Sequence, residues 1–93
     1  MRAVWDGYVV AESDRTIVVE NNHYFPPESV NMEFLRESGH RSTCPWKGEA
    51  HYYNLAAEGD ESRNAAWSYP DPKEAAEHIR KHVAFWKDVE VVE

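Results

Sequence analysis

Residues 49–69, EAHYYNLAAEGDESRNAAWSY, indicate most strongly which architecture to expect. The segment 49–57 mixes aromatic, apolar and polar residues in a run that favours a strand, and residues 64–69 form a second such run, which Pro70 stops. The intervening Glu58-Gly59-Asp60-Glu61 has the glycine and acidic residues that are typical of a turn. The sequence therefore predicts an antiparallel β-hairpin over residues 49–69.

An earlier hairpin is predicted upstream of this one. Residues 4–11 form one β-prone run with Gly7 as a bulge, and residues 16–20 form a second strand that is rich in β-branched side chains. The polar segment 12–15 separates the two strands. Further expected segments are a helical turn at 27–30, a strand at 32–37 and a loop at 38–42.

A helix is predicted over residues 72–86. Asp71 is a suitable N-cap, Pro72 suits the first helical position, and Glu74 completes a capping box. Apolar residues recur at helical spacing along this segment and would face the sheet. These residues are Ala75, Ile79, Val83 and Trp86, and a closing strand is expected over 89–92.

The predicted fold class is α+β with predominantly antiparallel β structure. Ninety-three residues suit a single domain over 1–93. We expect two hairpins and short strands, with one C-terminal helix packed on the sheet. Nothing in the sequence resembles a βαβ unit or a glycine-rich phosphate loop.

The net charge of −7, from 17 acidic and 10 basic residues, limits the classes of partner. Double-stranded nucleic acid and polybasic membrane anchoring both need clustered lysine and arginine, so we expect neither partner. No apolar run reaches the roughly 18 residues of a membrane span, and no signal-peptide pattern opens the chain, which predicts a cytoplasmic protein. A lone cysteine, Cys44, excludes an intramolecular disulfide. The expected oligomeric state is a monomer or a weak homodimer.

The segment Thr43-Cys44-Pro45-Trp46-Lys47-Gly48 concentrates reactive and turn-forming residues. A rigid turn of this composition would present Cys44 and Lys47 to a ligand, with Lys47 pairing an anionic group. A nearby cation lowers a thiol pKa, and a Cys–His pair is the minimal nucleophile and base. The alternative is a buried cysteine in a loop that packing alone explains. The histidines considered as partners are His23, His40 and His51, and the catalytic candidates are Cys44, Lys47 and His23.

Aromatic residues supply the rest of the candidate site. The segment His23-Tyr24-Phe25-Pro26-Pro27 is either a pocket rim or an aromatic staple at the end of the first hairpin. Successive side chains of a strand point to opposite faces, so Tyr52 and Tyr53 do not share one, and Tyr53 is our pocket candidate. The expected ligand-binding residues are Tyr24, Cys44, Lys47, Tyr53, Trp67 and Tyr69.

No metal site is expected, although the chain has five histidines. His78 and His82 lie four residues apart on the predicted helix, but the residues between them do not complete an HExxH motif. The adjacent Arg80 and Lys81 disfavour a bound cation. The sequence names no cofactor.

Several ordered motifs resemble the DUF427 family, a group of small, mostly bacterial proteins of unknown function. They are Asn22-His23-Tyr24-Phe25-Pro26-Pro27-Glu28, Thr43-Cys44-Pro45-Trp46-Lys47-Gly48, Tyr52-Tyr53, Ala66-Trp67-Ser68-Tyr69-Pro70 and Val83-Ala84-Phe85. The resemblance extends from about Val4 to Val92. The family also carries a nucleotidyltransferase label, but the clustered carboxylates of two-metal phosphoryl transfer are not obvious here.

Three functional hypotheses follow. The first is a domain that binds a small anionic ligand or a nucleotide in an aromatic-lined pocket, with or without catalysis. The second is a non-enzymatic protein-interaction module that uses exposed aromatic side chains. The third is a thiol enzyme that depends on Cys44. The sequence does not decide whether the protein is an enzyme.

Overall fold

The computed structural model describes residues 1–93, and nine short strands account for most of the chain. Helical structure is limited to three 3₁₀ segments, η1 (Pro27–Ser29), η2 (Met32–Phe34) and η3 (Glu74–Ile79). The strands are β1 (Arg2–Trp5), β2 (Tyr8–Glu12), β3 (Ile17–Val19), β4 (Asn22–Tyr24), β5 (Leu35–Cys44), β6 (Gly48–Ala57), β7 (Asp60–Ser68), β8 (Val83–Phe85) and β9 (Glu90–Val92).

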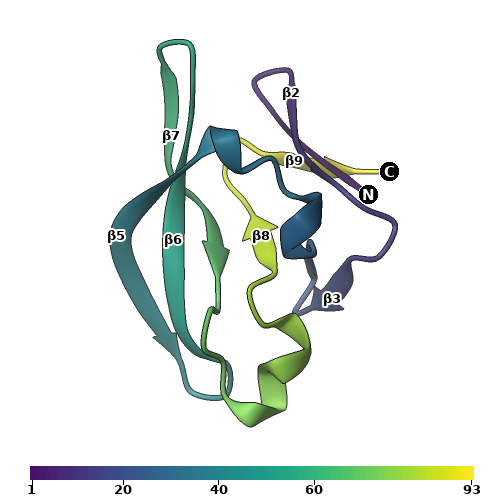
Figure 1. Ribbon diagram of the computed structural model, residues 1–93, viewed down its shortest axis with the longest axis vertical. Coiled ribbons are helices and arrows are strands. Elements are labelled where there is room, and N and C mark those ends of the chain that lie inside the picture. The colour runs from purple at the N-terminus through teal and green to yellow at the C-terminus, as the bar shows by residue number, and fades with distance from the viewer.

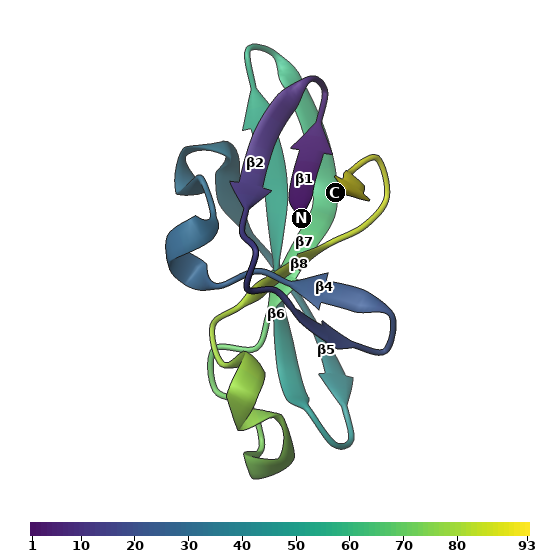
Figure 2. The same ribbon diagram turned by 90° about the vertical axis from the view of Figure 1, so that its right-hand side faces the viewer.

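The strands form three antiparallel sheets (Figures 1 and 2). A four-stranded sheet has the order β5-β6-β7-β8, a three-stranded sheet has the order β2-β1-β9, and β3 and β4 form a separate hairpin. The predicted hairpin over residues 49–69 is confirmed as β6 and β7, and the predicted closing strand is confirmed as β9. The expected loop at 38–42 lies instead inside the long strand β5.

Two-residue turns join three of the strand pairs. Asp6-Gly7, Glu20-Asn21 and Glu58-Gly59 all have positive φ at both residues, as type I′ turns require. Such turns match the right-handed twist of the flanking strands. Residues 4–11 are therefore not one strand with a bulge at Gly7: the chain reverses there, and β1 pairs with β2.

The predicted helix over 72–86 is absent, so the α+β class is wrong and the fold is built from antiparallel sheets. The segment begins with the Lys73 backbone N–H bonded to the carbonyl of Lys47 rather than in a capping box. Non-helical dihedrals at Ala76 break η3, and Lys81 has a φ of 62°. The chain then continues into β8, which pairs with β7.

Burial explains why β8 forms in place of a helix. Val83, Ala84 and Phe85 are consecutive and all buried, which suits a strand covered on both faces and not a one-sided helix. By contrast, Trp86 is 47% exposed, although the helical pattern placed it on the buried side. The apparent spacing of apolar residues therefore reflected two different elements.

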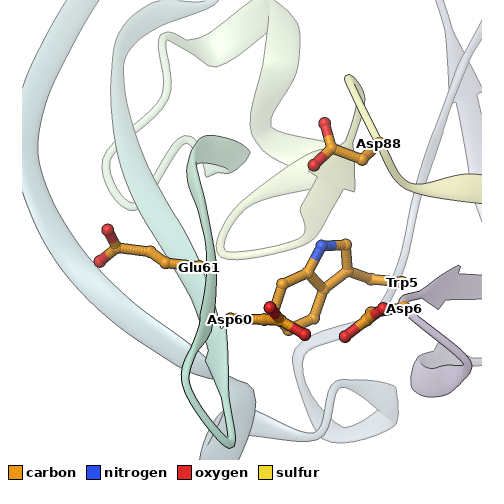
Figure 3. A pocket seen from close by; sticks show the side chains of 5 residues that line it. All are labelled: Trp5, Asp6, Asp60, Glu61 and Asp88. Carbon is orange, nitrogen blue, oxygen red and sulfur yellow. The ribbon is translucent and has the colours of Figure 1, made fainter.

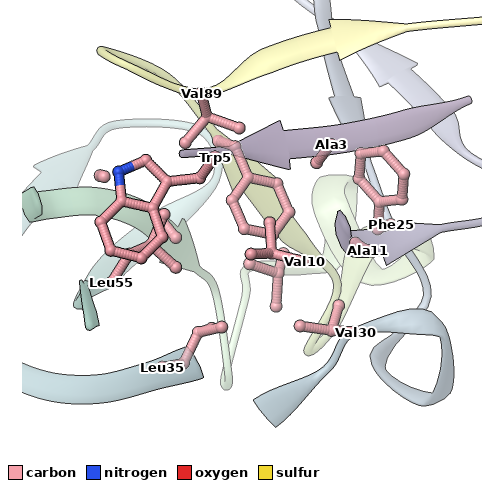
Figure 4. Close-up of a cluster of buried hydrophobic side chains, with 13 residues drawn as sticks. Ala3, Trp5, Val10, Ala11, Phe25, Val30, Leu35, Leu55 and Val89 are labelled. Atoms are coloured by element: carbon pink, nitrogen blue, oxygen red, sulfur yellow. The ribbon is translucent and has the colours of Figure 1, made fainter. Parts of the chain in front are cut away.

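Two clusters of buried side chains lie on opposite faces of the four-stranded sheet. Across β6, β7 and β8 the register aligns Tyr53, Ala66 and Phe85; Ala66 and Phe85 belong to the first cluster, and Tyr53 packs against it. This cluster also includes Trp5, Phe25 and Leu55, and joins the sheet to β1 and β2 (Figure 4). One residue further along, the register aligns Tyr52, Trp67 and Ala84, which belong to the second cluster.

Candidate ligand-binding cleft

A cleft of about 270 Å³ opens on the sheet face that carries the second cluster. Its residues come from β4, the β5–β6 turn, β6, β7 and the segments after β7 and β8. Three of the residues that the sequence singled out meet there: Lys47, Trp67 and Tyr69. Asn22, Tyr52 and Trp86 complete the lining.

Strand register produces the aromatic wall of the cleft. Tyr52 and Trp67 are direct cross-strand partners, so their side chains share a face, and their ring centroids lie 6.3 Å apart. Trp86 packs edge-on against Trp67 at 5.8 Å, with its indole N–H donating to the carbonyl of Asn64. The wall thus offers three adjacent ring systems to a bound molecule.

Lys47 supplies the only charged side chain of the lining. It lies in the β5–β6 turn, yet its side chain is only 7% exposed. The ammonium group lies 5.3 Å from the centroid of the Tyr69 ring and 5.5 Å from that of Trp46. Gly48 lets the turn approach the segment 71–73 closely, because a Cβ there would lie 3.4 Å from the Lys73 nitrogen.

Glu20 is the ion-pair partner of Lys47. Its carboxylate accepts hydrogen bonds from the Lys47 ammonium and, at 3.4 Å, from the Trp46 indole nitrogen. The Lys47 hydrogen bond holds the pKa of Glu20 below its usual value. Glu20 is half-exposed on the β3–β4 turn, so one partner of this pair is buried and the other reaches solvent.

The charge of Lys47 is strongly held. Burial by itself lowers the pKa of Lys47, but the hydrogen bond to Glu20 and the negative charge of the Glu20 carboxylate oppose that effect. The pKa is therefore raised above the ordinary lysine value. The side chain therefore presents a positive charge to the cleft at neutral pH.

Comparison with known proteins identifies the family. A family model described as "Domain of unknown function (DUF427)" matches residues 1–93. The chain belongs to the DUF427 family. No curated protein matches the chain. The resemblance that the motifs suggested is thereby confirmed, but the family description assigns no activity, so the functional argument for this DUF427 protein rests on its cleft.

Tyr24 supports the cleft from behind instead of lining it. The side chain is fully buried, and its hydroxyl accepts a hydrogen bond of 3.1 Å from the indole nitrogen of Trp67. Burial raises the pKa of Tyr24 and also that of Tyr69. Both phenols therefore stay neutral, and Tyr24 orients the Trp67 ring that faces the cleft.

Cys44 lies beside the second cluster without a histidine partner. The thiol is half-buried and packs against that cluster. His23 is hydrogen-bonded to the hydroxyl of Thr16 at 2.8 Å, and His51 pairs with Glu49 at 3.1 Å. The ring of His40 packs at a tilt of 59° against that of Tyr52, with 4.7 Å between the ring centroids. None of the three histidines considered for a Cys–His pair is hydrogen-bonded to the thiol.

Tyr53 is the one candidate that the structure places on the other face of the sheet. It packs against the first cluster, whereas its neighbour Tyr52 lines the cleft. Alternation had restricted the choice to one of the two tyrosines, but it could not say which face would hold the cleft. Glu20 and Trp86 were missed because nothing local marks them: Glu20 is 27 residues from Lys47 in the chain.

No helical segment of the protein has the length and apolar character needed to cross a bilayer.

Proposed function

We propose that this DUF427 protein binds a small anionic molecule with a flat ring in the Lys47 cleft. The observation that carries the proposal is a buried lysine ammonium in a cleft that is also lined by the aromatic rings of Tyr52, Trp67 and Trp86. Binding sites combine an apolar lining with a few polar groups that fix orientation, and this lining has that composition.

The Lys47 ammonium is the proposed anion contact. An ammonium has three donors, and Glu20 takes one of them, so donors remain for a carboxylate or phosphate oxygen. A charge this deep costs desolvation free energy, which an anion in the cleft would offset together with Glu20. Tyr69, whose ring lies beside the same ammonium, completes the polar end of the site.

Tyr52, Trp67 and Trp86 are the proposed ring contacts. Aromatic side chains stack on flat ligands whatever the ring's substituents, and such stacking contributes about 1–3 kcal/mol per base in nucleic-acid complexes. The volume of about 270 Å³ is slightly below the roughly 300–1,000 Å³ of typical ligand pockets. A single ring system with one anionic group therefore suits the cleft better than a dinucleotide.

Thermal-shift measurements with charged and neutral probe pairs test this proposal. The pairs are AMP with adenosine and indole-3-acetate with indole-3-acetamide, which differ in the anionic group. A ligand at 100 times its dissociation constant adds about 2.7 kcal/mol to the free energy of unfolding. We expect at least one anion to raise Tm and its neutral counterpart to have little effect.

Lys47→Met is the decisive variant, and Lys81→Met is its control. Lys81 is exposed and lies outside the cleft, so its replacement changes the net charge equally without touching the site. The anion-induced Tm shift should disappear in Lys47→Met and persist in Lys81→Met. An equal shift in both variants would rule out Lys47 as the anion contact.

A further inference from the structure

A second cavity lies at the other end of the β6–β7 hairpin (Figure 3). Its volume is about 380 Å³, and three acidic segments meet there: the β1–β2 turn, the first residues of β7 and the segment between β8 and β9. The tips of the β1–β2 and β6–β7 turns lie at the same end of the molecule in Figures 1 and 2. We call this cavity the acidic cup, and it is lined by Trp5, Asp6, Asp60, Glu61 and Asp88.

Three carboxylates of the acidic cup have no cationic partner. Asp6, Asp60 and Asp88 take part in no ion pair, whereas Glu61 pairs with Arg63 at 3.4 Å. In Figure 3 the first three carboxylates surround the Trp5 indole, and that of Glu61 points away from it. A hydrogen bond to Asp60 and repulsion from its charge raise the pKa of Asp6, which means that these two carboxyl groups of the cup lie close enough to interact.

Trp5 gives an independent indication that the cup is incomplete. The residue is 3% exposed, and it is the only tryptophan whose indole N–H donates no hydrogen bond. The other three indoles donate to Glu20, Tyr24 and Asn64. The indole nitrogen of Trp5 lies on the edge of the ring toward Asp88 in Figure 3, so its N–H is available to an acceptor in the cup. It is not sealed off from the cup.

We propose that the acidic cup binds a guanidinium group whose parent molecule also brings a carbonyl oxygen to the indole N–H of Trp5. A ligand in the cup has to bring a positive charge to the carboxylates of Asp6, Asp60 and Asp88. It also has to bring a hydrogen-bond acceptor to the indole N–H of Trp5. An arginine residue has both groups, the guanidinium on its side chain and the carbonyl in its backbone. The ligand class is therefore a peptide or small molecule that contains arginine.

A guanidinium satisfies the cup better than other cations. Its five donors lie in a plane and pair bidentately with carboxylates, so one group reaches two of the three acids. An ammonium is a compact and strongly hydrated charge that spans less of an open cavity. A metal ion does not suit the site, because no three acidic, histidine or cysteine side chains of the protein are placed to share one.

Proton–nitrogen correlation spectra of the four tryptophan indoles provide the test. The probe is N-acetyl-arginine amide, and its neutral isostere N-acetyl-citrulline amide is the control. We expect the arginine probe at millimolar concentration to move the Trp5 indole resonance, which Trp5→Phe identifies by its loss. The citrulline probe should leave it in place. An arginine probe that leaves the Trp5 signal unmoved, or moves it no further than citrulline does, overturns the proposal.

Matched charge variants separate the cup from the general negative field of the protein. Asp60→Asn with Asp88→Asn removes two charges from the cup, and Glu28→Gln with Glu74→Gln removes two exposed charges elsewhere. At 0.1 M salt the screening length is about 10 Å, so remote charges contribute little. The cup variant should raise the dissociation constant of the arginine probe at least tenfold. The control variant should raise it by less than about twofold, which is within the precision of a titration. Equal weakening in both would mean that the probe senses net charge only.

This inference is independent of the Lys47 cleft. The cup shares no lining residue with the cleft, and the two respond to probes of opposite charge. Failure of the arginine probe would leave the anion experiment unaffected, and the reverse also holds.

Discussion

The Lys47 cleft and the acidic cup lie toward opposite ends of the β6–β7 hairpin. They differ in whether their charged groups have partners within the protein. In the cleft a buried ammonium has its counter-ion within the protein, Glu20, and its neighbouring indole, Trp67, has its acceptor in Tyr24. In the cup three of the four carboxylates lack a cationic partner, and the Trp5 indole N–H donates no hydrogen bond within the protein. A buried charge needs an internal partner for the chain to fold, whereas exposed charges are stabilised by water and can be left for a ligand.

Tyr24→Phe should have the largest effect on this difference between the cleft and the cup. It removes the buried acceptor of Trp67 and so gives the cleft an unpaired indole, as the cup already has. An unsatisfied buried donor costs about 1–3 kcal/mol, so urea denaturation should show a loss of that size in the free energy of unfolding. Tyr53→Phe is the matched control, because its hydroxyl makes no hydrogen bond within the protein, and it should change stability by less than about 0.5 kcal/mol. Equal losses in the two variants would contradict the role given to the Tyr24 hydroxyl.

Acid should destabilise the cleft end through Glu20. Its pKa is lowered by Lys47, so the pair contributes stability that is present above the ordinary glutamate pKa of about 4.3 and is lost as pH falls through the lowered value. Glu20→Gln should therefore have a lower Tm than the unmodified protein at pH 7. The difference should vanish in strong acid. A Tm difference that stays constant with pH would exclude the ion pair as its cause.

The cup end should respond to acid in the opposite direction. The pKa of Asp6 is raised by Asp60, so repulsion is present above that raised value and is relieved as pH falls through it. Asp6→Asn should raise Tm slightly at pH 7, and the gain should disappear below the ordinary aspartate pKa of about 3.9. Asp14→Asn, an exposed acid outside the cup, is the control. A variant that lowers Tm at pH 7 would show that Asp6 is not repelled.

Local sequence signals predicted the second hairpin and failed at the helix. Alternating side chains and a Gly59 turn are complete within residues 49–69, so β6 and β7 could be recognised without tertiary information. Helical spacing over 72–86 combined η3 with β8, and only the pairing of β8 with β7 distinguishes them. The consecutive buried residues Val83, Ala84 and Phe85 were the signal available for a strand.

The candidate site was predictable only where residues are near one another in sequence or already prominent by type. Lys47 in its proline–glycine turn, and Trp67 with Tyr69, could be selected from the chain alone. Asp6-Gly7 is a strong hairpin signal and would have separated β1 from β2. Glu20 and the acidic cup could not be predicted, because each depends on segments that meet only in the folded chain.

The pairing of β1 with β9 has a consequence for the order in which the protein folds. Arg2 is the register partner of Val92, so this ladder closes nearly the whole chain into a loop. Closing a long loop costs more entropy than closing a two-residue turn, and non-local pairings slow folding. The hairpins β1–β2, β3–β4 and β6–β7 can form from local contacts, while β9 has only β1 to pair with. We therefore expect β9 to add last, and Asp88, just before it, to complete the acidic cup at the end of folding.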